Sequence, residues 1–419
     1  MLWRNVSLLP LAATFASASV LPVRDDAQDA ASTSFLLDVA RRETGERNFH
    51  QEWAAVRQKW GGNTSKSGPS PFSLADDDGL VDVHPMGNDD LYLADIQIGN
   101  PPQTVKMALD TGSSDVWVQS TDTNYRINRN GPWAPQYHPK DSHTSTLLNE
   151  SRWDVQYLDG TAAFGIVYQD TIRFGNIEVA NATVQSAQTM ASRFETDIEM
   201  SGIMGLAKRL RNNVQPPVPT FMDVLTPLLD SPVFTVDLKK NATGQFEFGR
   251  IDMAKASDNI TWLDSVGRSP HWDVNFDLTS WTTPDQTWWY YRFSGTIDTG
   301  TTLMFLPSAL ASRYWYSVPG MRPAKELDGA YTFPCANAKE LPDLLFKLPG
   351  TEHVLTIPGR YLNYGPADKN GEYCWGGMQS SEGMEIVVLG DIMLKALFVA
   401  FDLDKQRVGF ANKVLTDEM

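Results

Sequence analysis

Short apolar stretches separated by turn-forming residues dominate the chain from residue 80 onward. Runs rich in Val, Ile, Thr and aromatic residues alternate with Gly, Pro, Asn and Asp at the close spacing that is typical of strands and turns. Helical patterns are few, and the clearest of them cover residues 221–229 and 308–317. The pattern therefore predicts an all-β fold with few helices.

Residues 33–60 have a different pattern, in which apolar residues stand at helical spacing with basic residues between them. This spacing predicts short helices that dock on the rest of the chain. Residues 61–71 are rich in Gly, Ser and Pro and are typical of a linker. The apolar positions of the predicted helices are Phe35, Leu36, Val39, Trp53, Val56 and Trp60.

The first 18 residues predict a signal peptide, because one basic residue precedes a short apolar core that ends in Ala16-Ser17-Ala18. A buried N-terminal helix is the alternative. No other apolar run approaches the ~20 residues of a transmembrane helix, and the C-terminal residues lack the hydrophobic tail of a lipid anchor. We therefore expect a secreted protein without a membrane anchor; a vacuolar or lysosome-like location is the alternative.

The composition is acidic, with a formal net charge of −16 at pH 7. Such a surface argues against nucleic acid and anionic membranes as partners. An acidic surface also suits work at low pH, where protonation of carboxylates lowers the self-repulsion, although ordinary solubility explains the charge equally well.

The chain contains two cysteines, Cys335 and Cys374. In a secreted protein a single pair most simply forms one disulfide. The alternative, a redox or metal site, lacks a Cys-x-x-Cys spacing and a nearby His cluster. Beyond the predicted signal peptide, five sequons permit N-glycosylation in the same compartment, at Asn63, Asn149, Asn181, Asn241 and Asn259.

The strongest chemical signal is the triplet Asp-Thr-Gly, which begins at Asp110 and again at Asp298, each time between two apolar runs. A carboxylate on a Gly turn between two strands points out of a tight loop. An apolar-apolar-Gly motif follows each triplet at nearly the same distance and ends at Gly205 and Gly390. This repeat indicates two related halves, each of which carries one carboxylate to a shared water. The alternative is a pair of ordinary Asp-Gly turns.

From residue 80 to about residue 415 the chain resembles the pepsin family of bilobal aspartic proteases, most closely its secreted fungal members. The matching segments are the two Asp-Thr-Gly loops and residues 91–99, 157–161, 248–252 and 389–402. The resemblance implies an all-β fold of two pseudo-symmetric, barrel-like lobes, with a cleft between them and a flap hairpin over the cleft. It also implies a propeptide at residues 19–78, an N-terminal lobe at residues 79–252 and a C-terminal lobe at residues 253–419.

The same resemblance implies that Asp110 and Asp298 together activate a water molecule that attacks the peptide carbonyl. Two carboxylates held close together cannot both ionise freely, so one takes the proton from the water while the other, protonated, stabilises the intermediate. The reaction needs no metal, cofactor or covalent intermediate, and none is expected here. The supporting residues of the two loops are Thr111, Gly112, Ser113, Thr299, Gly300 and Thr301.

The residues that match the flap and other substrate-binding positions of the family are Tyr157, Leu158, Asp159, Gly160, Thr302 and Trp117. The resemblance implies that Tyr157 packs on the substrate and that Trp117 shares a hydrogen bond with it. Leu158 departs from the Gly common at its position, which puts the affinity for peptide in doubt. Asp159 is placed to pair with a Lys before the scissile bond, as an Asp does in related fungal enzymes; a β-turn Asp is the alternative.

The propeptide of a family member lays a basic residue against the two catalytic carboxylates until acid breaks the pairing. Lys59 and Lys66 are the candidates for this residue, and the mature chain is expected to start near Gly79. Arg41-Arg42 is an alternative processing site.

We therefore expect a secreted acid endopeptidase, made as a zymogen and sensitive to pepstatin, that cleaves polypeptides at hydrophobic residues, with cleavage at Lys as the open case. A monomer is expected. An inactive binding module with the same fold is a second class, although both triplets and Tyr157 are intact. A metal hydrolase is a third class; it needs further ligands, and none of the six His lies close in sequence to either triplet.

Overall fold

The structure is a computed structural model, which describes residues 34–41, 49–61, 91–126, 133–156, 162–208, 212–267, 269–282, 287–327 and 329–415. All of them belong to one compact unit, Thr33–Met419. The predicted signal peptide, the expected mature start near Gly79, the candidate Lys66 and residues 157–161 of the flap lie outside the described residues.

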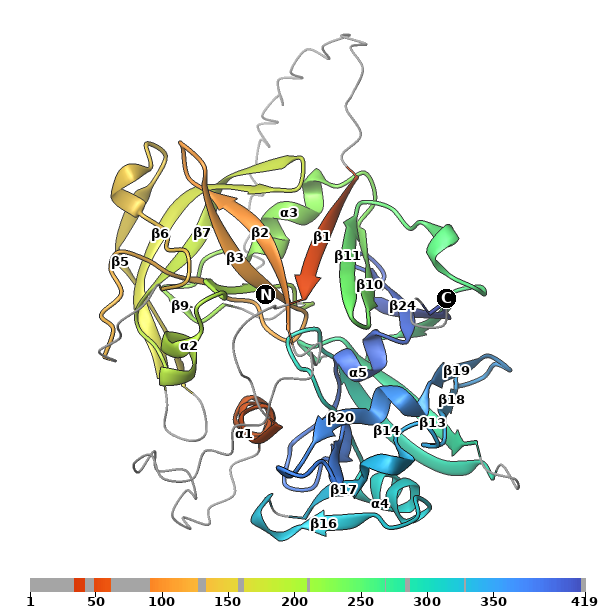
Figure 1. Cartoon of the computed structure of the whole chain (residues 1–419). Coiled ribbons are helices and arrows are strands. Elements are labelled where there is room, and N and C mark those ends of the chain that lie inside the picture. Colours follow the sequence, from red (N-terminus) through yellow and green to blue (C-terminus); the bar gives the residue numbers. More distant parts are fainter. Residues whose placement is uncertain are drawn as a thin grey trace, which may run out of the picture. The chain divides into compact units, whose positions relative to one another are not determined.

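Strands of the described ranges form three sheets (Figure 1). The largest sheet contains β1 (Phe35–Arg41), β2 (Tyr92–Ile98), β3 (Gln103–Asp110), β4 (Val116–Gln119), β5 (Thr146–Gln156), β6 (Ala162–Phe174), β7 (Ile177–Thr189), β8 (Gly202–Gly205), β9 (Val214–Gln215), β10 (Val233–Lys239), β11 (Ala242–Phe248), β12 (Thr261–Asp264), β24 (Leu397–Asp402) and β25 (Arg407–Asn412). Its strands lie in the order β12-β25-β24-β10-β11-β1-β2-β3-β8-β4-β7-β6-β5-β9. The second, in the order β19-β18-β13-β14-β23-β15-β22, contains β13 (Asp273–Trp281), β14 (Trp289–Ile297), β15 (Met304–Leu306), β18 (Leu344–Lys347), β19 (Val354–Ile357), β22 (Met378–Ser380) and β23 (Val387–Leu389). The third, in the order β16-β17-β21-β20, contains β16 (Arg322–Ala324), β17 (Ala330–Pro334), β20 (Asn363–Pro366) and β21 (Tyr373–Gly376).

Helices of the described residues are short apart from the first. The α-helices are α1 (Phe49–Trp60), α2 (Ser192–Thr196), α3 (Phe221–Leu225), α4 (Ser308–Tyr316) and α5 (Asp391–Leu394). The 3₁₀ turns are η1 (Pro139–Asp141), η2 (Thr226–Leu228), η3 (Met253–Lys255), η4 (Lys325–Leu327), η5 (Cys335–Asn337) and η6 (Gly359–Leu362). The all-β prediction is confirmed, and the helices expected at residues 221–229 and 308–317 are present as α3 with η2 and as α4.

Part of the largest sheet closes on itself. β2 pairs with β3 and also with β6, so the order β2-β3-β8-β4-β7-β6 returns to its first strand and forms a barrel. Closure gives each of these strands neighbours on both sides, which removes exposed strand edges. β10, β11, β24 and β25 continue the sheet away from the barrel, so it contains strands from both ends of the chain.

Residues 34–61, which we call the N-terminal segment, begin with a strand, so the helix predicted around Phe35 was wrong. β1 pairs with β11 and, at its end, with β2 (Figure 1). Phe35 and Val39 are buried and Leu36 is exposed, which is the alternation of a strand. The three apolar positions fit a helix equally well, and pairing with β11 decided between the two periods. The second predicted helix is present as α1.

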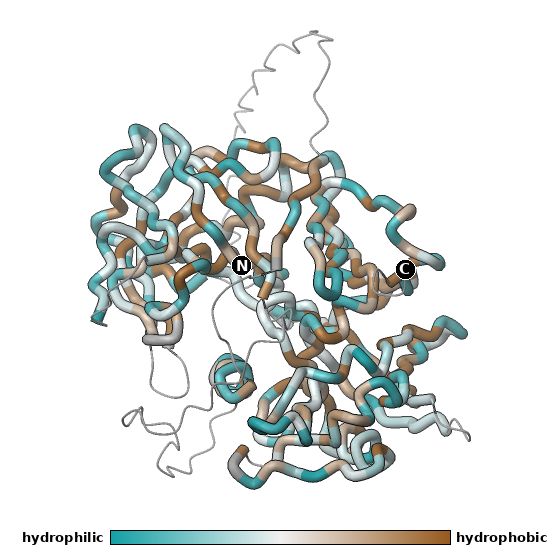
Figure 2. The backbone as a smooth tube through the Cα atoms, in the orientation of Figure 1, coloured by the Kyte–Doolittle hydropathy of each residue, from teal (hydrophilic) through white to brown (hydrophobic). Residues whose placement is uncertain are grey.

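Buried apolar side chains gather along the strands, and Figure 2 marks the hydrophobic residues in brown along the backbone. A smaller cluster joins α1 to the C-terminal half of the chain. In this cluster Phe49 stacks on Trp375 with ring centroids 4.3 Å apart, and Trp53 packs against Phe305. Burying four apolar residues of one helix face against this surface holds α1 in place.

The internal repeat seen in the sequence has one geometry in both halves. β3 ends at Asp110 and pairs in parallel with β8, and β14 ends just before Asp298 and pairs in parallel with β23. The apolar-apolar-Gly motif therefore forms the strand that lies beside each Asp-bearing strand.

The Gly that ends each motif is needed because it packs against a loop backbone. A Cβ on Gly205 would lie 2.5 Å from the carbonyl oxygen of Ser113, and a Cβ on Gly390 would overlap the carbonyl oxygen of Thr301. Both carbonyls belong to the Asp-Thr-Gly loops, so a side chain at either Gly would push a loop out of place.

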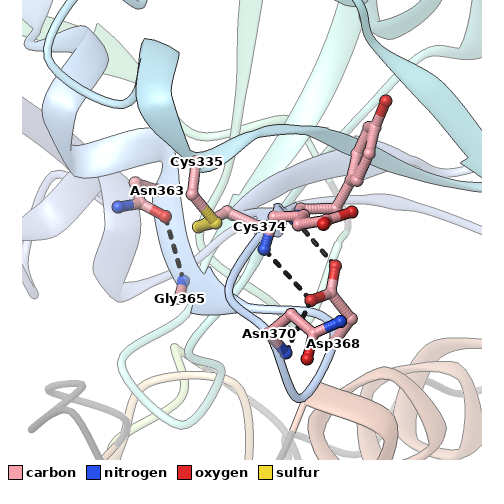
Figure 3. The surroundings of a disulfide bond; sticks show 8 residues. Cys335, Asn363, Gly365, Asp368, Asn370 and Cys374 are labelled. Carbon is pink, nitrogen blue, oxygen red and sulfur yellow. Dashed lines mark hydrogen bonds between the residues drawn. A yellow bond between two sulfur atoms is a disulfide. The ribbon is translucent and has the colours of Figure 1, made fainter.

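Cys335 and Cys374 form a disulfide across a sequence separation of 39 residues, as the sequence predicted (Figure 3). Closing a loop of this length stabilises a fold by about 4 kcal/mol in the chain-entropy model. Within the loop, the Asp368 carboxylate accepts hydrogen bonds from the backbone N–H groups of Asn370 and Tyr373. These bonds fix the turn that leads into Cys374 on β21.

Four of the five sequons lie at exposed positions, namely Asn149, Asn181, Asn241 and Asn259; Asn63 lies outside the described residues. Asn181 and Asn241 have φ values of 55° and 56°, which places them in the left-handed turns that Asn tolerates. Among the helices of the described ranges, none is long and apolar enough to cross a membrane.

Candidate active site

The two Asp-Thr-Gly loops meet and bond to each other through their Thr residues. The Thr111 hydroxyl donates to the carbonyl oxygen of Ile297 at 2.8 Å, and the Thr299 hydroxyl donates to that of Leu109 at 2.6 Å. Each hydroxyl also accepts the backbone N–H of the other Thr at 3.0 Å. Four hydrogen bonds among buried groups therefore fix one loop relative to the other.

Gly112 and Gly300 allow the loops to approach closely. Each donates its backbone N–H to the inner oxygen of its own loop's carboxylate, at 2.8 Å to Asp110 and 2.9 Å to Asp298. A Cβ on Gly112 would lie 2.6 Å from the Asp298 carboxylate, and a Cβ on Gly300 would collide with that of Asp110. A side chain at either Gly would therefore separate the two carboxylates.

The outer oxygen of each carboxylate accepts a hydroxyl hydrogen bond. Ser113 donates to Asp110 at 2.6 Å, and Thr301 donates to Asp298. Both carboxylates are buried, and their own loops supply them with matching donors. Hydrogen bonds of this kind favour the ionised form of a carboxyl group and hold its plane.

Lys59, at the end of α1, places its ammonium group between the two carboxylates. Its Nζ lies 2.9 and 3.1 Å from the Asp110 oxygens and 3.1 and 3.0 Å from the Asp298 oxygens. Of the two Lys candidates, Lys59 is thus in contact with the carboxylates, and Lys66 lies outside the described residues.

Burial and the neighbouring charges act in opposite directions on this group. Burial raises the pKa of Asp110 above its usual range and outweighs the attraction of Lys59. Burial also acts to raise the pKa of Asp298 and is the largest single influence on it, but the charge of Lys59 together with hydrogen bonds from Asp110, Thr301 and Lys59 outweighs burial and leaves this pKa lowered. These two directions belong to one coupled pair, in which a first proton binds far more readily than a second. Burial opposes the charge on Lys59, yet the two carboxylates raise its pKa.

Other residues of the N-terminal segment also bind the site, and the sequence did not point to them. The Trp60 indole N–H donates to Asp298 at 3.2 Å, and the Glu52 carboxylate accepts the Thr302 hydroxyl at 3.0 Å. The Trp60 carbonyl accepts the backbone N–H of Glu385 at 3.0 Å. The helical pattern predicted that Trp60 is buried but contained no information about which surface buries it.

His271 is a further neighbour that the sequence analysis missed. Its ring packs edge-on against the Trp60 ring, with centroids 4.8 Å apart. His271 precedes β13, where Asp273 pairs with Thr296 of the strand that leads to Asp298. This strand pairing, with the hydrogen bond from the indole of the neighbouring Trp272 to the carbonyl of Leu206, brings the imidazole to the site, although His271 lies far from both triplets in sequence.

Burial lowers the pKa of the His271 imidazole, and the charge on Lys59 acts in the same direction. The carboxylates of Asp273 and Asp110 and the backbone of Gly112 oppose this change without overcoming it. The imidazole therefore stays neutral to a lower pH than a solvent-exposed His does while the N-terminal segment covers it.

Of the remaining predicted site residues, Trp117 is buried among apolar side chains, with Phe194 and Trp153 as ring neighbours. Its expected partner Tyr157, together with Leu158, Asp159 and Gly160, lies outside the described residues. In the part of the chain that the structure describes, no three His, Cys, Asp or Glu side chains form a group that could hold a metal ion.

In an aspartic protease, each half of an all-β chain contributes one Asp-Thr-Gly loop, and the two loops place their carboxylates side by side; Asp110 and Asp298 have this arrangement. The chain belongs to the eukaryotic aspartyl protease family, whose model matches residues 91–413. This match includes both Asp-Thr-Gly loops and excludes the N-terminal segment.

Several fungal proteases are similar to the chain over most of its length. Endothiapepsin of Cryphonectria parasitica is 37% identical over 327 residues, which cover 78% of this chain and 76% of the relative. Podosporapepsin of Podospora anserina is 38% identical over 81% of this chain and 78% of its own length. Penicillopepsin-1 of Penicillium janthinellum is 34% identical over 80% of this chain and 98% of its own length. The protein is therefore a pepsin-type aspartic endopeptidase.

Proposed function

We propose that the protein is made as a secreted zymogen and that its active form hydrolyses peptide bonds with a water held between Asp110 and Asp298. The position of the Lys59 ammonium carries this proposal. Its nitrogen lies within 3.1 Å of all four carboxylate oxygens. Once Lys59 has left, a water oxygen in the same place can hydrogen-bond to both carboxylates.

The reaction then proceeds by general acid–base catalysis. The ionised carboxylate accepts a proton from the water, and the water oxygen attacks the peptide carbonyl carbon. The protonated carboxyl donates a hydrogen bond to the carbonyl oxygen and stabilises the charge that develops there. A proton then passes to the leaving nitrogen as the C–N bond breaks. The single proton of the resting enzyme belongs to the pair rather than to Asp110 or Asp298 alone.

The N-terminal segment is the inhibitory part of the proposed zymogen, within a propeptide at residues 19–78. The ion pairs that hold this segment in the site, between Lys59 and the two carboxylates, depend on ionised carboxylates. Because Asp298 has a lowered pKa in this state, its ion pair contributes stability above the ordinary pKa of 3.8. That contribution is lost as the pH falls through the lowered value, so acid weakens these ion pairs. The active enzyme then consists of the lobes at residues 79–252 and 253–419 and acts as a monomer.

Proteolysis of denatured haemoglobin after acid incubation tests this proposal. We expect cleavage with an optimum at about pH 3–5, because a pair that shares one proton loses activity when it holds none or two. We also expect pepstatin to abolish the cleavage. An optimum near neutral pH, or activity that pepstatin leaves unchanged, would contradict the proposed mechanism.

We further propose that Asp159 at the flap tip pairs with a Lys that precedes the scissile bond, in addition to cleavage at hydrophobic residues. The position of Asp159 in the flap-like segment of the sequence supports this, although the residue lies outside the described ranges. An ion pair at this place adds to the binding of Lys substrates only.

Replacing Asp159 with Ala is expected to lower kcat/KM for a peptide with Lys at that position by about tenfold while leaving the matched Phe peptide unchanged. Measuring both peptides with the same enzyme preparation separates a change in selectivity from a loss of active enzyme. Equal losses on the Lys and Phe peptides would assign Asp159 to the turn alone.

A further inference from the structure

We propose that His271 selects the side chain of one of the two substrate residues that flank the scissile bond, and that it favours side chains ending in an amide or a carboxyl group. The inference rests on the function proposed above. It concerns the place beside the carboxylate pair that Trp60 fills in the structure.

Trp60 occupies a position that a substrate residue takes when the N-terminal segment has left. It follows Lys59, whose ammonium lies between the carboxylates, and its own indole nitrogen lies 3.2 Å from Asp298. The backbone continues past the site by pairing with the second half of the chain: the Trp60 carbonyl accepts the N–H of Glu385, and Gly61 forms a β-bridge with Met384. A side chain this close to Asp298 belongs to a residue next to the reacting carbonyl.

His271 forms a wall of this place, and one of its nitrogens is left without a partner. Its Nδ1 is buried and makes no hydrogen bond within the described residues. Trp60 cannot supply one, because an indole has a single N–H and that group donates to Asp298. The N-terminal segment thus fills the position sterically and leaves a buried polar atom unsatisfied.

A substrate side chain with a polar end can form the hydrogen bond to the His271 Nδ1 that Trp60 does not form. A buried polar atom without a partner weakens a complex, and a ligand group that supplies the partner regains that loss. An amide offers both a donor and an acceptor, so it pairs with Nδ1 in either protonation state, and a carboxylate pairs with the imidazolium. The charged groups that face the imidazole are Asp273, Asp110 and Lys59, of which Lys59 departs with the N-terminal segment.

The test uses the activated enzyme and pairs of peptides that differ only in Gln or Met at one residue beside the scissile bond. Gln and Met have similar shapes, so the pair isolates the hydrogen bond. With both peptides competing in one reaction, the ratio of their kcat/KM values does not depend on the amount of active enzyme. At one of the two flanking positions we expect His271→Phe to lower the Gln-to-Met ratio by about tenfold. His271→Gln, which keeps hydrogen-bonding groups, should retain most of the preference.

The same Gln-to-Met ratio in the wild-type enzyme and in His271→Phe, at both positions, would overturn the inference. So would a wild-type enzyme that prefers Met by tenfold or more at both positions, and this measurement needs no variant. Cleavage of neither peptide by the wild-type enzyme would instead count against the proposed function, so the two failures are distinguishable.

Discussion

Replacing Asp298 with Asn lowers kcat for peptide hydrolysis by at least about a thousandfold, because the pair then has no group that can exchange a proton at this position. The change is close to isosteric, and the carboxylate of Asp298 is fully buried among donors from Gly300 and Thr301. The amide oxygen can still accept from the Gly300 N–H while the amide NH2 donates to the Thr301 hydroxyl, but an amide neither takes the proton of a water nor gives up a proton to a carbonyl oxygen. The loss therefore falls on kcat rather than on substrate binding.

The measurement is kcat and KM on an internally quenched peptide at acid pH, with the acid-treated enzyme. Asp95→Asn is the matched control, since it makes the same substitution of Asp by Asn at an exposed position of β2. The control should keep its activity, and both variants should melt as cooperatively as the wild type. More than about a tenth of wild-type kcat in the folded Asp298→Asn variant would remove Asp298 from the chemistry.

Replacing Lys59 with Met lets the full-length chain cleave peptides without acid treatment, at a rate about a hundredfold or more above that of the wild-type chain. Lys59 is the shared partner of two buried carboxylates. Removing one partner of a buried ion pair costs about 3–5 kcal/mol, which corresponds to a factor of 100 or more in the population of the open state. The apolar face of α1 remains in the variant and limits the gain.

Activity is measured from pH 3 to pH 7 on freshly prepared full-length chain, before any self-cleavage is seen on a gel. The wild-type chain should become active only as the pH falls through the lowered pKa of Asp298, whereas the variant should already be active at higher pH. Lys106→Met removes one positive charge from a partly exposed side chain of β3 and serves as the control. A Lys59→Met chain that still requires acid would show that the α1 packing alone closes the site.

The carboxylate pair could be predicted because each Asp lies in a short sequence motif and this motif occurs twice. Asp110 and Asp298 lie in identical triplets, and each is followed by a Gly that has to pack against its loop. The disulfide could be predicted because Cys335 had a single possible partner in the chain. In both cases a short motif or a rare residue occurs just twice in the sequence, so few pairings had to be considered.

Contacts that depend on tertiary placement could not be predicted. The choice between Lys59 and Lys66 depends on where α1 ends relative to the carboxylates, and sequence distance does not encode this position. His271 reaches the site through the pairing of β13 with β14 and the contacts of its neighbour Trp272, which are tertiary. The helix predicted at β1 was wrong for a related reason. Phe35 and Val39 fit the spacing of a helix and that of a strand, and the strand forms because β11 pairs with it.

The Thr111 and Thr299 hydrogen bonds join residues that are 188 positions apart, and Thr301 is in turn held through its carbonyl by the N–H of Asp391. During synthesis the chain leaves the ribosome from its N-terminus, so Lys59 emerges long before either of these partners. The contact of Thr301 with Asp391 forms only after almost the whole chain has been made. The segment that carries Lys59 is therefore made first and the last contact of the carboxylate loops is made near the end of synthesis, so a chain whose synthesis stops before Asp391 lacks part of the support of the second loop.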